Sequence, residues 1–304
     1  MTSLHPTNAQ RSEGAAAAPL AIELVGINKH FGPVHANRDI HLAIKRGTVH
    51  GIVGENGAGK STLMSILYGF YTADSGEIRV NGTPATITDS RHALALGIGM
   101  VHQHFMLVDN FSVLIPRKDA MILSRAEDSA FLAPTLTKAR TQLKALARDY
   151  GLEVDPDAII ENLSVGQQQR VEILKALYRG AETLILDEPT GVLTPDEADH
   201  LFRILGKLRD EGKTIILITH KLREIMAITD EVSVMRQGAM VKTLTTKETS
   251  PGELAELMVG RRVLLRVEKG PANPGKVLLD VENLVVTDDF KVPRVKGVSF
   301  QVRA

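Results

Sequence analysis

Residues Gly54-Glu-Asn-Gly-Ala-Gly-Lys60-Ser61-Thr62 decide the fold of this chain. Two glycines bracket four residues and are followed by a lysine and a hydroxyl residue, which is the pattern of a phosphate-binding loop. The glycines let the backbone wrap around a phosphate with its N–H groups pointing inward. Lys60 would supply a positive charge for the β and γ phosphates, and Ser61 would offer a hydroxyl to Mg²⁺. A purely structural glycine-rich turn is the alternative.

The segments around this loop favour the phosphate-binding interpretation, because an apolar strand pattern precedes it and a helical pattern follows it. The residues expected to contact nucleotide here are Gly54, Glu55, Asn56, Gly57, Ala58, Gly59, Lys60, Ser61 and Thr62.

The pattern away from the loop is that of an α/β protein. Strands are predicted at Ile22–Ile27, Ile40–Ile44, Val49–Val53, Ile78–Val80, Leu184–Leu186, Thr214–Thr219 and Glu231–Arg236. Helices are predicted at Thr62–Tyr68, Asp196–Asp210 and Leu222–Ile228. Two of the strands are almost continuously apolar and need cover on both faces, so we expect a largely parallel core sheet.

Two carboxylates end one of these apolar strands, in Leu184-Ile-Leu-Asp187-Glu188-Pro189. Asp187 would hold Mg²⁺, directly or through water, and Glu188 would orient and polarise an attacking water. Taken alone, the pair is equally well explained as an ordinary strand end. Its occurrence after a phosphate-binding loop in the same chain favours catalysis.

A second candidate anion-binding segment is Asn162-Leu-Ser164-Val-Gly166-Gln167-Gln-Gln-Arg170. Ser164 and Gly166 would lie at the N-terminus of a helix that runs to about Tyr178. One nucleotide does not need two such surfaces from the same subunit, so the segment is expected to close on a phosphate held by another copy. A plain helix cap would explain Ser164 but not the residues that follow it.

The remaining segments suggest the domain organisation. Residues 1–20 lack periodicity and are expected to be a disordered tail, with a signal peptide as the less favoured alternative. The span 104–180 reads as a mostly helical insertion interrupted by prolines, and 263–276 as a linker.

An internal repeat follows the linker. Leu278–Leu284 aligns with Ala21–Ile27, and three later apolar residues match three of the Ile40–Ile44 strand after a one-residue gap. Residues 277–304 are therefore expected to begin a second, truncated copy of the domain at 21–262. Coincidence between two strand-rich segments is the alternative.

Composition excludes several classes of protein. The 304 residues include no Cys, so disulfide scaffolds and Cys-ligated metal sites are excluded. With 36 Lys and Arg against 36 Asp and Glu, net charge gives no reason to expect nucleic acid as the main partner. No apolar run approaches the roughly 20 residues that a membrane helix needs.

Taken in order, these motifs resemble the nucleotide-binding domain of ATP-binding cassette (ABC) transporters over residues 22 to about 260. The resemblance implies a P-loop NTPase core with an antiparallel β subdomain and a helical subdomain. It also implies that Phe31 stacks on adenine, that Gln103 contacts Mg²⁺ and the attacking water, and that His220 contacts the γ-phosphate. In isolation these three would be explained as a core aromatic, a solvated polar residue and a helix N-cap.

A finer resemblance is to the tandem ATPases of bacterial sugar and nucleoside importers, carried by Met100–Leu107 and Pro189–Pro195. It implies ATP and Mg²⁺ as ligands, membrane permease subunits, an external solute-binding protein and a second cassette as partners, and a peripheral location on the cytoplasmic face of the cell membrane. Two departures stand out. Thr194 replaces the aspartate of most cassettes, and Leu114-Ile-Pro-Arg117 interrupts a helix that docks the membrane subunit.

The sequence thus predicts an ATPase that energises import of a nucleoside or sugar, with Glu188, His220 and Gln103 as catalytic residues. Ser164, Gly166 and Gln167 would contact nucleotide, and Ser61, Gln103 and Asp187 would hold the metal. A soluble ABC ATPase acting on ribosomes or DNA would share these motifs, but the long charged linker or coiled-coil insertion expected of it is absent from the sequence.

Overall fold

The computed structural model describes residues 19–102, 107, 113, 132–262, 270, 273–288 and 291–304. The chain divides into two compact units, Met1–Val263 and Leu264–Ala304. Several sequence predictions lie outside the described residues: the tail at 1–18, Gln103, the interruption at 114–117, and most of the linker.

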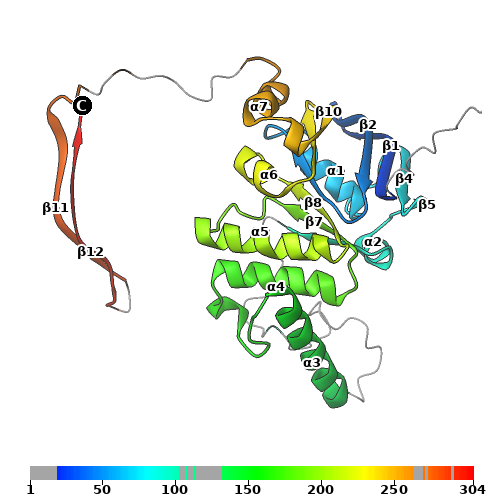
Figure 1. Cartoon of the computed structure of the whole chain (residues 1–304), viewed down its shortest axis with the longest axis horizontal. Coiled ribbons are helices and arrows are strands. Elements are labelled where there is room, and N and C mark those ends of the chain that lie inside the picture. The colour runs from blue at the N-terminus through cyan, green and yellow to red at the C-terminus, as the bar shows by residue number, and fades with distance from the viewer. Residues whose placement is uncertain are drawn as a thin grey trace, which may run out of the picture. The chain divides into compact units, whose positions relative to one another are not determined.

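The described part of the first unit begins with three strands, after which strands and helices are interspersed along the chain (Figure 1). The strands are β1 Leu20–Phe31, β2 Val34–Lys45, β3 Val49–Val53, β4 Ser75–Val80, β5 Thr83–Ala85, β6 Ile98–Val101, β7 Thr183–Asp187, β8 Thr214–Ile218, β9 Glu231–Arg236 and β10 Ala239–Thr245. The helices are α1 Lys60–Leu67, α2 Ser90–Ala95, α3 Leu132–Tyr150, α4 Val165–Tyr178, α5 Pro195–Asp210, α6 Leu222–Ile228 and α7 Pro251–Val259. Short 3₁₀ turns occupy Ile160–Asn162 and Thr246–Glu248.

A six-stranded sheet in the order β10-β9-β3-β8-β7-β6 forms the centre of the unit. All neighbouring strands are parallel except β10, which pairs antiparallel with β9. Every residue of β3, β7 and β8 is buried. Their side chains alternate between two cores: Ile185 and Ile216 enter one, whereas Leu184 and Leu186 enter the other. The predicted parallel sheet with cover on both faces is confirmed.

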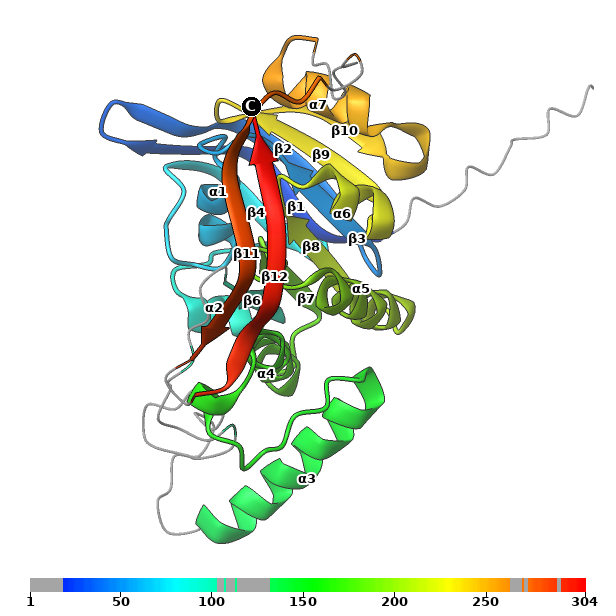
Figure 2. The ribbon, with the colours of Figure 1, turned by 90° about the vertical axis from the view of Figure 1, so that its left-hand side faces the viewer.

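The two faces of this sheet have different cover. Helices α3 to α7 contribute to the core on one face, where α4 and α5 lie side by side in both views (Figures 1 and 2). On the other face, α1 packs between the central sheet and an antiparallel sheet in the order β2-β1-β4-β5. Helix α1 begins at Lys60, inside the phosphate-loop sequence of residues 54–62, so this packing fixes the loop at the carboxyl end of β3.

The second unit contains one described hairpin, β11 Val277–Thr287 and β12 Pro293–Arg303. Its pairing repeats that of β1 and β2. In the first hairpin, three cross-strand pairs are Ile22–Ile44, Leu24–Leu42 and Ile27–Ile40. In the second hairpin, the corresponding pairs are, in the same order, Leu279–Val302, Val281–Phe300 and Leu284–Val298. Both hairpins have an irregularity in register directly before the last of these pairs.

The two hairpins also share a left-handed backbone at matching positions. In the first, Gly26 has φ 65° and Asp39 has φ 44°. In the second, Asn283 has φ 48° and Gly297 has φ 72°. Each hairpin thus uses one glycine and one Asn or Asp, the residues that tolerate this conformation, with the two exchanged between strands. The sequence repeat therefore extends to the details of strand pairing.

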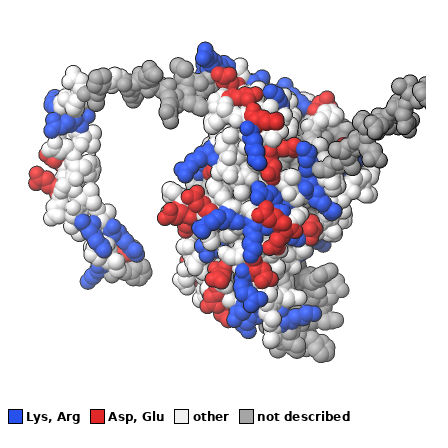
Figure 3. All heavy atoms as spheres, viewed as in Figure 1, with Lys and Arg blue, Asp and Glu red and all other residues white. Residues whose placement is uncertain are grey.

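Among the described residues, no helix is both long and apolar enough to cross a membrane. The face of the first unit seen in Figure 3 has Lys and Arg side chains intermingled with Asp and Glu side chains. Helix α5 contributes both signs, with acidic residues in its first turn and basic residues in its last. Charges placed in this way stabilise the helix through its dipole. The mixture of both signs leaves that face without an extended patch of one charge.

Candidate functional site

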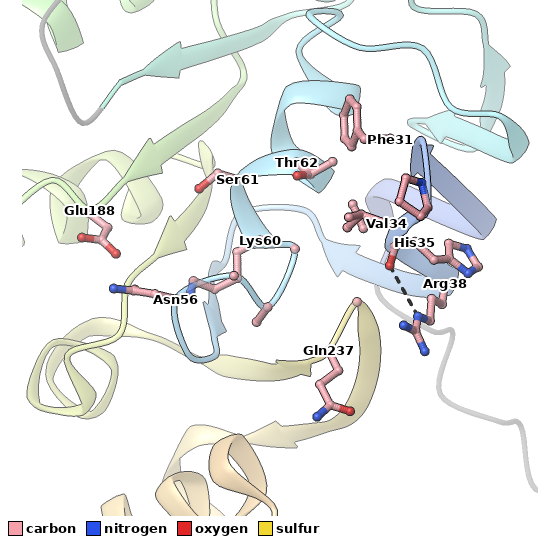
Figure 4. A pocket seen from close by; sticks show the side chains of 16 residues that line it. Phe31, Val34, His35, Arg38, Asn56, Lys60, Ser61, Thr62, Glu188 and Gln237 are labelled. Atoms are coloured by element: carbon pink, nitrogen blue, oxygen red, sulfur yellow. Dashed lines mark hydrogen bonds between the residues drawn. The ribbon is translucent and has the colours of Figure 1, made fainter.

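A cavity of about 730 Å³ lies at the phosphate-loop sequence. It is lined by Phe31, Pro33, Val34, His35, Ala36, Arg38, Asn56, Gly57, Ala58, Gly59, Lys60, Ser61, Thr62, Glu188, Gln237 and Gly238. In Figure 4, Glu188 lies at one end, Phe31, His35 and Arg38 lie at the other, and Lys60 and Ser61 lie between them. A carboxylate, a lysine and an aromatic ring thus line a single elongated site.

The loop has a backbone that requires glycine at particular positions. Gly57 has φ 81° and Gly59 has φ 97°, both in the left-handed region. A Cβ on Gly59 would also lie 2.3 Å from the Ala36 carbonyl oxygen of β2. Gly59 is the N-cap of α1, and the Asn37 amide donates to its carbonyl over 3.1 Å. Helix α1 consequently begins at Lys60, two residues earlier than the helical pattern predicts.

Lys60 is held inside the loop. Its ammonium group donates to the carbonyl oxygens of Gly54 at 2.8 Å and Glu55 at 3.0 Å, and the residue is only 6% exposed. Burial lowers the pKa of Lys60, while the nearby carboxylates of Glu188 and Asp187 act in the opposite direction. The charge is thereby positioned at the floor of the cavity, where an anion would gain most from it.

Asp187 and Ser61 form an oxygen-rich pair beside the cavity. Asp187 ends β7, and Ser61 lies in the first turn of α1 and lines the cavity. Burial raises the pKa of Asp187, the nearby Ser61 hydroxyl opposes that rise, and the neighbouring Glu188 carboxylate adds to it. A hydroxyl and a carboxylate are the hard oxygen donors that Mg²⁺ prefers, so these residues fit that ion.

Glu188 and His220 are brought into contact from the ends of neighbouring strands. The His220 ring nitrogen Nδ1 lies 2.9 Å from Glu188 Oε1. The Glu188 backbone N–H donates to the Ile218 carbonyl oxygen of β8 at 2.9 Å. Glu188 has φ 46°, a left-handed conformation that is strained for a residue with a side chain. The strained backbone and these contacts aim its carboxylate into the cavity.

The far end of the cavity has an aromatic character. Phe31 is 41% exposed, with its edge against Tyr71 at a centroid distance of 5.1 Å. The Lys29 ammonium lies 5.5 Å from the Phe31 ring centroid. Such an exposed ring offers a flat surface for stacking a planar base, and the core-aromatic explanation of Phe31 does not fit its exposure.

Several lining residues carry no motif and were missed by the sequence analysis. Val34, His35 and Arg38 come from the start of β2, and Gln237 from the β9–β10 turn. Two backbone bonds hold this turn against the site, from Arg38 N to Gly238 O at 2.7 Å and from Gly238 N to Ala58 O at 3.1 Å. Adjacent Gln237 and Gly238 both have positive φ, but the sequence alone does not say where such a turn packs.

The Ser164 segment lies elsewhere. Ser164 is the N-cap of α4, where its hydroxyl accepts from Gln167 N and the Gln167 side chain accepts from Ser164 N, at 3.3 and 2.9 Å. Ser164, Gly166 and Gln167 do not line the described cavity. The plain capping interpretation therefore describes the local structure, and the contact of this segment with a phosphate held by another copy stays a prediction.

Comparison with known sequences points to one family. A family model described as ABC transporter matches residues 37–191. The chain is 47% identical over 283 residues to the nucleoside import ATP-binding protein NupA of Lactococcus lactis subsp. cremoris, covering 93% of this chain and 55% of that protein. It is 47% identical to the guanosine import ATP-binding protein NupO of Bacillus subtilis, covering 93% and 54%. The chain thus spans about half the length of these relatives.

Solved structures share the fold of the first unit. The cbiO1 protein of Clostridium perfringens, part of the cbiONQ transporter complex, is similar with a TM-score of 0.65 and 29% identity, over 79% of this chain and 93% of that one. A nucleotide-free cassette from an ABC transporter gives a TM-score of 0.67 at 23% identity, over 78% and 98%. At that identity the second match speaks for the fold alone.

Proposed function

This chain belongs to the ABC transporter family, and on that premise we propose that it binds and hydrolyses ATP to energise import of a nucleoside or sugar. The observation that carries the proposal is the cavity in which Lys60 and Glu188 face the same space, with His220 in contact with the glutamate. The names of relatives that import nucleosides and guanosine support the class of solute.

In the proposed complex, the triphosphate lies along the loop of residues 54–62 and the base stacks on Phe31. Backbone N–H groups of the loop and the N-terminus of α1 favour the negative phosphates. Lys60 exchanges its bonds to the loop carbonyls for bonds to the β and γ phosphate oxygens. The aromatic ring and the carboxylate occupy opposite ends of the cavity, so a base stacked on Phe31 would lie away from the reacting phosphate (Figure 4).

Hydrolysis then needs a base near the γ-phosphate. Glu188 accepts a proton from water as the water oxygen attacks phosphorus and the bond to ADP breaks. His220 Nδ1 contacts the carboxylate over 2.9 Å, and the resemblance adds a contact of His220 with the γ-phosphate. The resemblance adds Gln103 to this group, and its position stays a prediction.

Ser61 and Asp187 would hold Mg²⁺, with Gln103 as the third ligand that the resemblance implies. When bound, the ion neutralises charge on the phosphate oxygens. The Ser61 hydroxyl partly offsets the raised pKa of the Asp187 carboxylate, which supports the placement of these two oxygen donors as neighbours.

We further propose that two cassettes share each nucleotide, with Ser164, Gly166 and Gln167 of one facing the phosphates held by the other. Ser164, Gly166 and Gln167 do not line the cavity at the 54–62 loop of their own unit, which supports this arrangement. Residues 277–304 would open a second cassette in the same protein, which the matching register of the two hairpins supports. ATP that binds the closed pair more tightly drives closure, and hydrolysis releases it.

The partners proposed for this ATPase are membrane permease subunits and an external solute-binding protein. It would act at the cytoplasmic face of the cell membrane as a peripheral subunit. The support is the import activity named for several relatives, including a ribose import protein of Chromobacterium violaceum at 40% identity.

The test is Glu188→Gln in the 304-residue chain. We expect ATP affinity within about twofold of the unmodified chain and turnover at least ~100-fold slower, because the amide cannot take the proton. Calorimetric titration with ATP and phosphate release measure the two quantities separately.

Glu182→Gln is the matched control, because Glu182 precedes the same strand and pairs with Lys213 at the surface. Its turnover should stay within about twofold of the unmodified chain. Nearly unchanged turnover in Glu188→Gln would show that another group is the base.

A further inference from the structure

Three side chains tie together the loops that carry Glu188 and His220. Thr190 lies two residues after Glu188, and its hydroxyl donates to Glu224 Oε1 in α6. Lys221, which directly follows His220, donates to the Thr190 carbonyl oxygen at 3.0 Å and to its hydroxyl oxygen at 3.1 Å. The Lys221 ammonium is also 3.4 Å from Glu224 Oε1. We call this group the Thr190 clamp.

Two of the three residues of the Thr190 clamp are buried. Thr190 is 4% exposed and Glu224 is 6% exposed. The other carboxylate oxygen of Glu224 has no hydrogen-bond partner among the described residues. Burying a carboxylate with incomplete pairing costs free energy, and an apolar side chain would pack here without that cost. A carboxylate at this position therefore needs an explanation beyond stability.

Geometry supplies that explanation. Glu188 and His220 come from loops after two different strands, and their side chains meet at 2.9 Å. Glu188 also holds a strained backbone, which persists only where the surrounding structure determines it. The Glu188 carbonyl accepts from Gly191 N at 3.1 Å, so the turn that contains Thr190 begins at the glutamate itself. Fixing Thr190 therefore fixes that turn.

A further bond brings helix α4 to the same turn. The Gln169 side chain, 2% exposed, donates to the Pro189 carbonyl oxygen at 2.7 Å. Gln169 lies in the helix that Ser164 caps. The turn is thus held from one side by α4 and from the other by Lys221 and Glu224.

We infer that Thr190, Lys221 and Glu224 are positioning residues, which set the orientation of Glu188 against His220 and so prepare the carboxylate for its reaction with water. This inference rests on the proposed function, because it assigns the clamp to the same reaction. None of the three is expected to touch the nucleotide, since none lines the cavity. A displacement of about 1 Å in a reacting group can slow a reaction about 100-fold, so loss of such a clamp should appear in turnover.

The experiment compares Thr190→Val with Thr190→Ser. Valine keeps the shape and removes the hydroxyl, whereas serine keeps the hydroxyl. We expect Thr190→Val to lower kcat about 10- to 30-fold with KM for ATP within about twofold, and Thr190→Ser to stay within about threefold of the unmodified chain. Lys221→Met, at a half-exposed position, provides a second variant and should lower kcat about 10-fold.

Thr229→Val is the matched control. Thr229 is also buried, and its hydroxyl bonds to the Ile225 carbonyl at 2.8 Å and to Thr246 at 2.7 Å, away from the catalytic loops. Its loss should lower stability but leave kcat within about twofold. Equal kcat losses in Thr190→Val and Thr229→Val, or normal kcat in Thr190→Val, would overturn the inference.

A second readout does not depend on hydrolysis. The ring ¹⁵N resonances of His220, assigned by their loss in His220→Gln, report on its contact with Glu188. They should move in Thr190→Val and Lys221→Met and stay in place in Thr229→Val. Unmoved His220 resonances in both clamp variants would overturn the inference. Absence of ATP turnover in the unmodified chain would instead contradict the proposed function, and the resonances would still decide whether the clamp exists.

Discussion

Two segments of this chain combine serine and glycine at the start of a helix, yet they are built differently. In the loop of residues 54–62, the glycines open the backbone onto a cavity and Lys60 lies at its floor. At residues 164–167, the capping box between Ser164 and Gln167 satisfies the serine hydroxyl and its own backbone N–H. The first segment lines a cavity of its own unit. The second is a helix cap that does not line that cavity.

The glycines of the two segments differ for the same reason. Gly57 and Gly59 have left-handed φ values. Gly166 has no positive φ, but a Cβ there would lie 2.7 Å from a carboxylate oxygen of Glu197. Gly57 and Gly59 therefore shape the backbone of the loop, whereas Gly166 makes room for the Glu197 side chain at the start of α5. Similar local sequences thus acquire different roles from what packs against them.

Ser164→Arg should break this comparison most strongly. We expect no detectable hydrolysis, a loss of at least ~1000-fold, because a bulky charge at the cap would keep a second cassette from closing. Affinity for ATP, measured by calorimetric titration of the 304-residue chain, should stay within about twofold. Weakened binding in the isolated chain would mean that the segment serves its own cavity.

Lys60→Met should give the opposite result. Removal of the charge takes away charge-assisted bonds to phosphate, so ATP affinity should fall about 100-fold. Thermal stability should fall modestly, since methionine fills a similar volume but the Gly54 and Glu55 carbonyl oxygens lose the hydrogen bonds from Lys60. ATP affinity unchanged by this substitution would show that the cavity is not the triphosphate site.

Gly59→Ala and Gly57→Ala should sharpen the comparison within the loop. Both replacements strain the backbone, but only at Gly59 would the new methyl group collide with a backbone carbonyl. We expect a loss in the free energy of unfolding of about 2 kcal/mol for Gly59→Ala and about 1 kcal/mol for Gly57→Ala. Urea denaturation followed by circular dichroism measures both, and equal losses would contradict the collision.

Ser164→Ala should have the smallest effect. It removes one capping bond from α4, and the free energy of unfolding should fall by roughly 1 kcal/mol. The affinity for ATP should not change. The same urea titration checks the first expectation, and a loss of ATP affinity would contradict the placement of the cap outside the cavity.

Much of the fold follows from the sequence. The predicted bounds of Val49–Val53, Glu231–Arg236 and Leu222–Ile228 are those of β3, β9 and α6, because apolar runs end there at turn residues. The elements β5, β6, β10, α2 and α7 were not predicted. Four are short, with three to seven residues, and give too few repeats of any period, whereas α7 had usable signals in the N-cap Ser250 and in Gly260.

The candidate site divides in the same way. The residues of the loop are consecutive in sequence, and so are Asp187 and Glu188. Each pattern can therefore be recognised from the sequence and predicts phosphate binding or hydrolysis. The contact of Glu188 with His220, and the clamp at Thr190, join segments about 30 residues apart. No spacing in the sequence specifies such contacts, since they depend on how β7 and β8 align. The wall formed by Arg38 and Gln237 was missed for the same reason.

The backbone of Glu188 has one more consequence. Glycine adopts a φ of 46° with less strain than glutamate, so the carboxylate at position 188 is kept at a cost in folding stability. Selection of variants for thermal stability alone would therefore favour Glu188→Gly, which removes the proposed catalytic base. Folding stability and the proposed turnover of ATP thus place opposite demands on the residue at position 188.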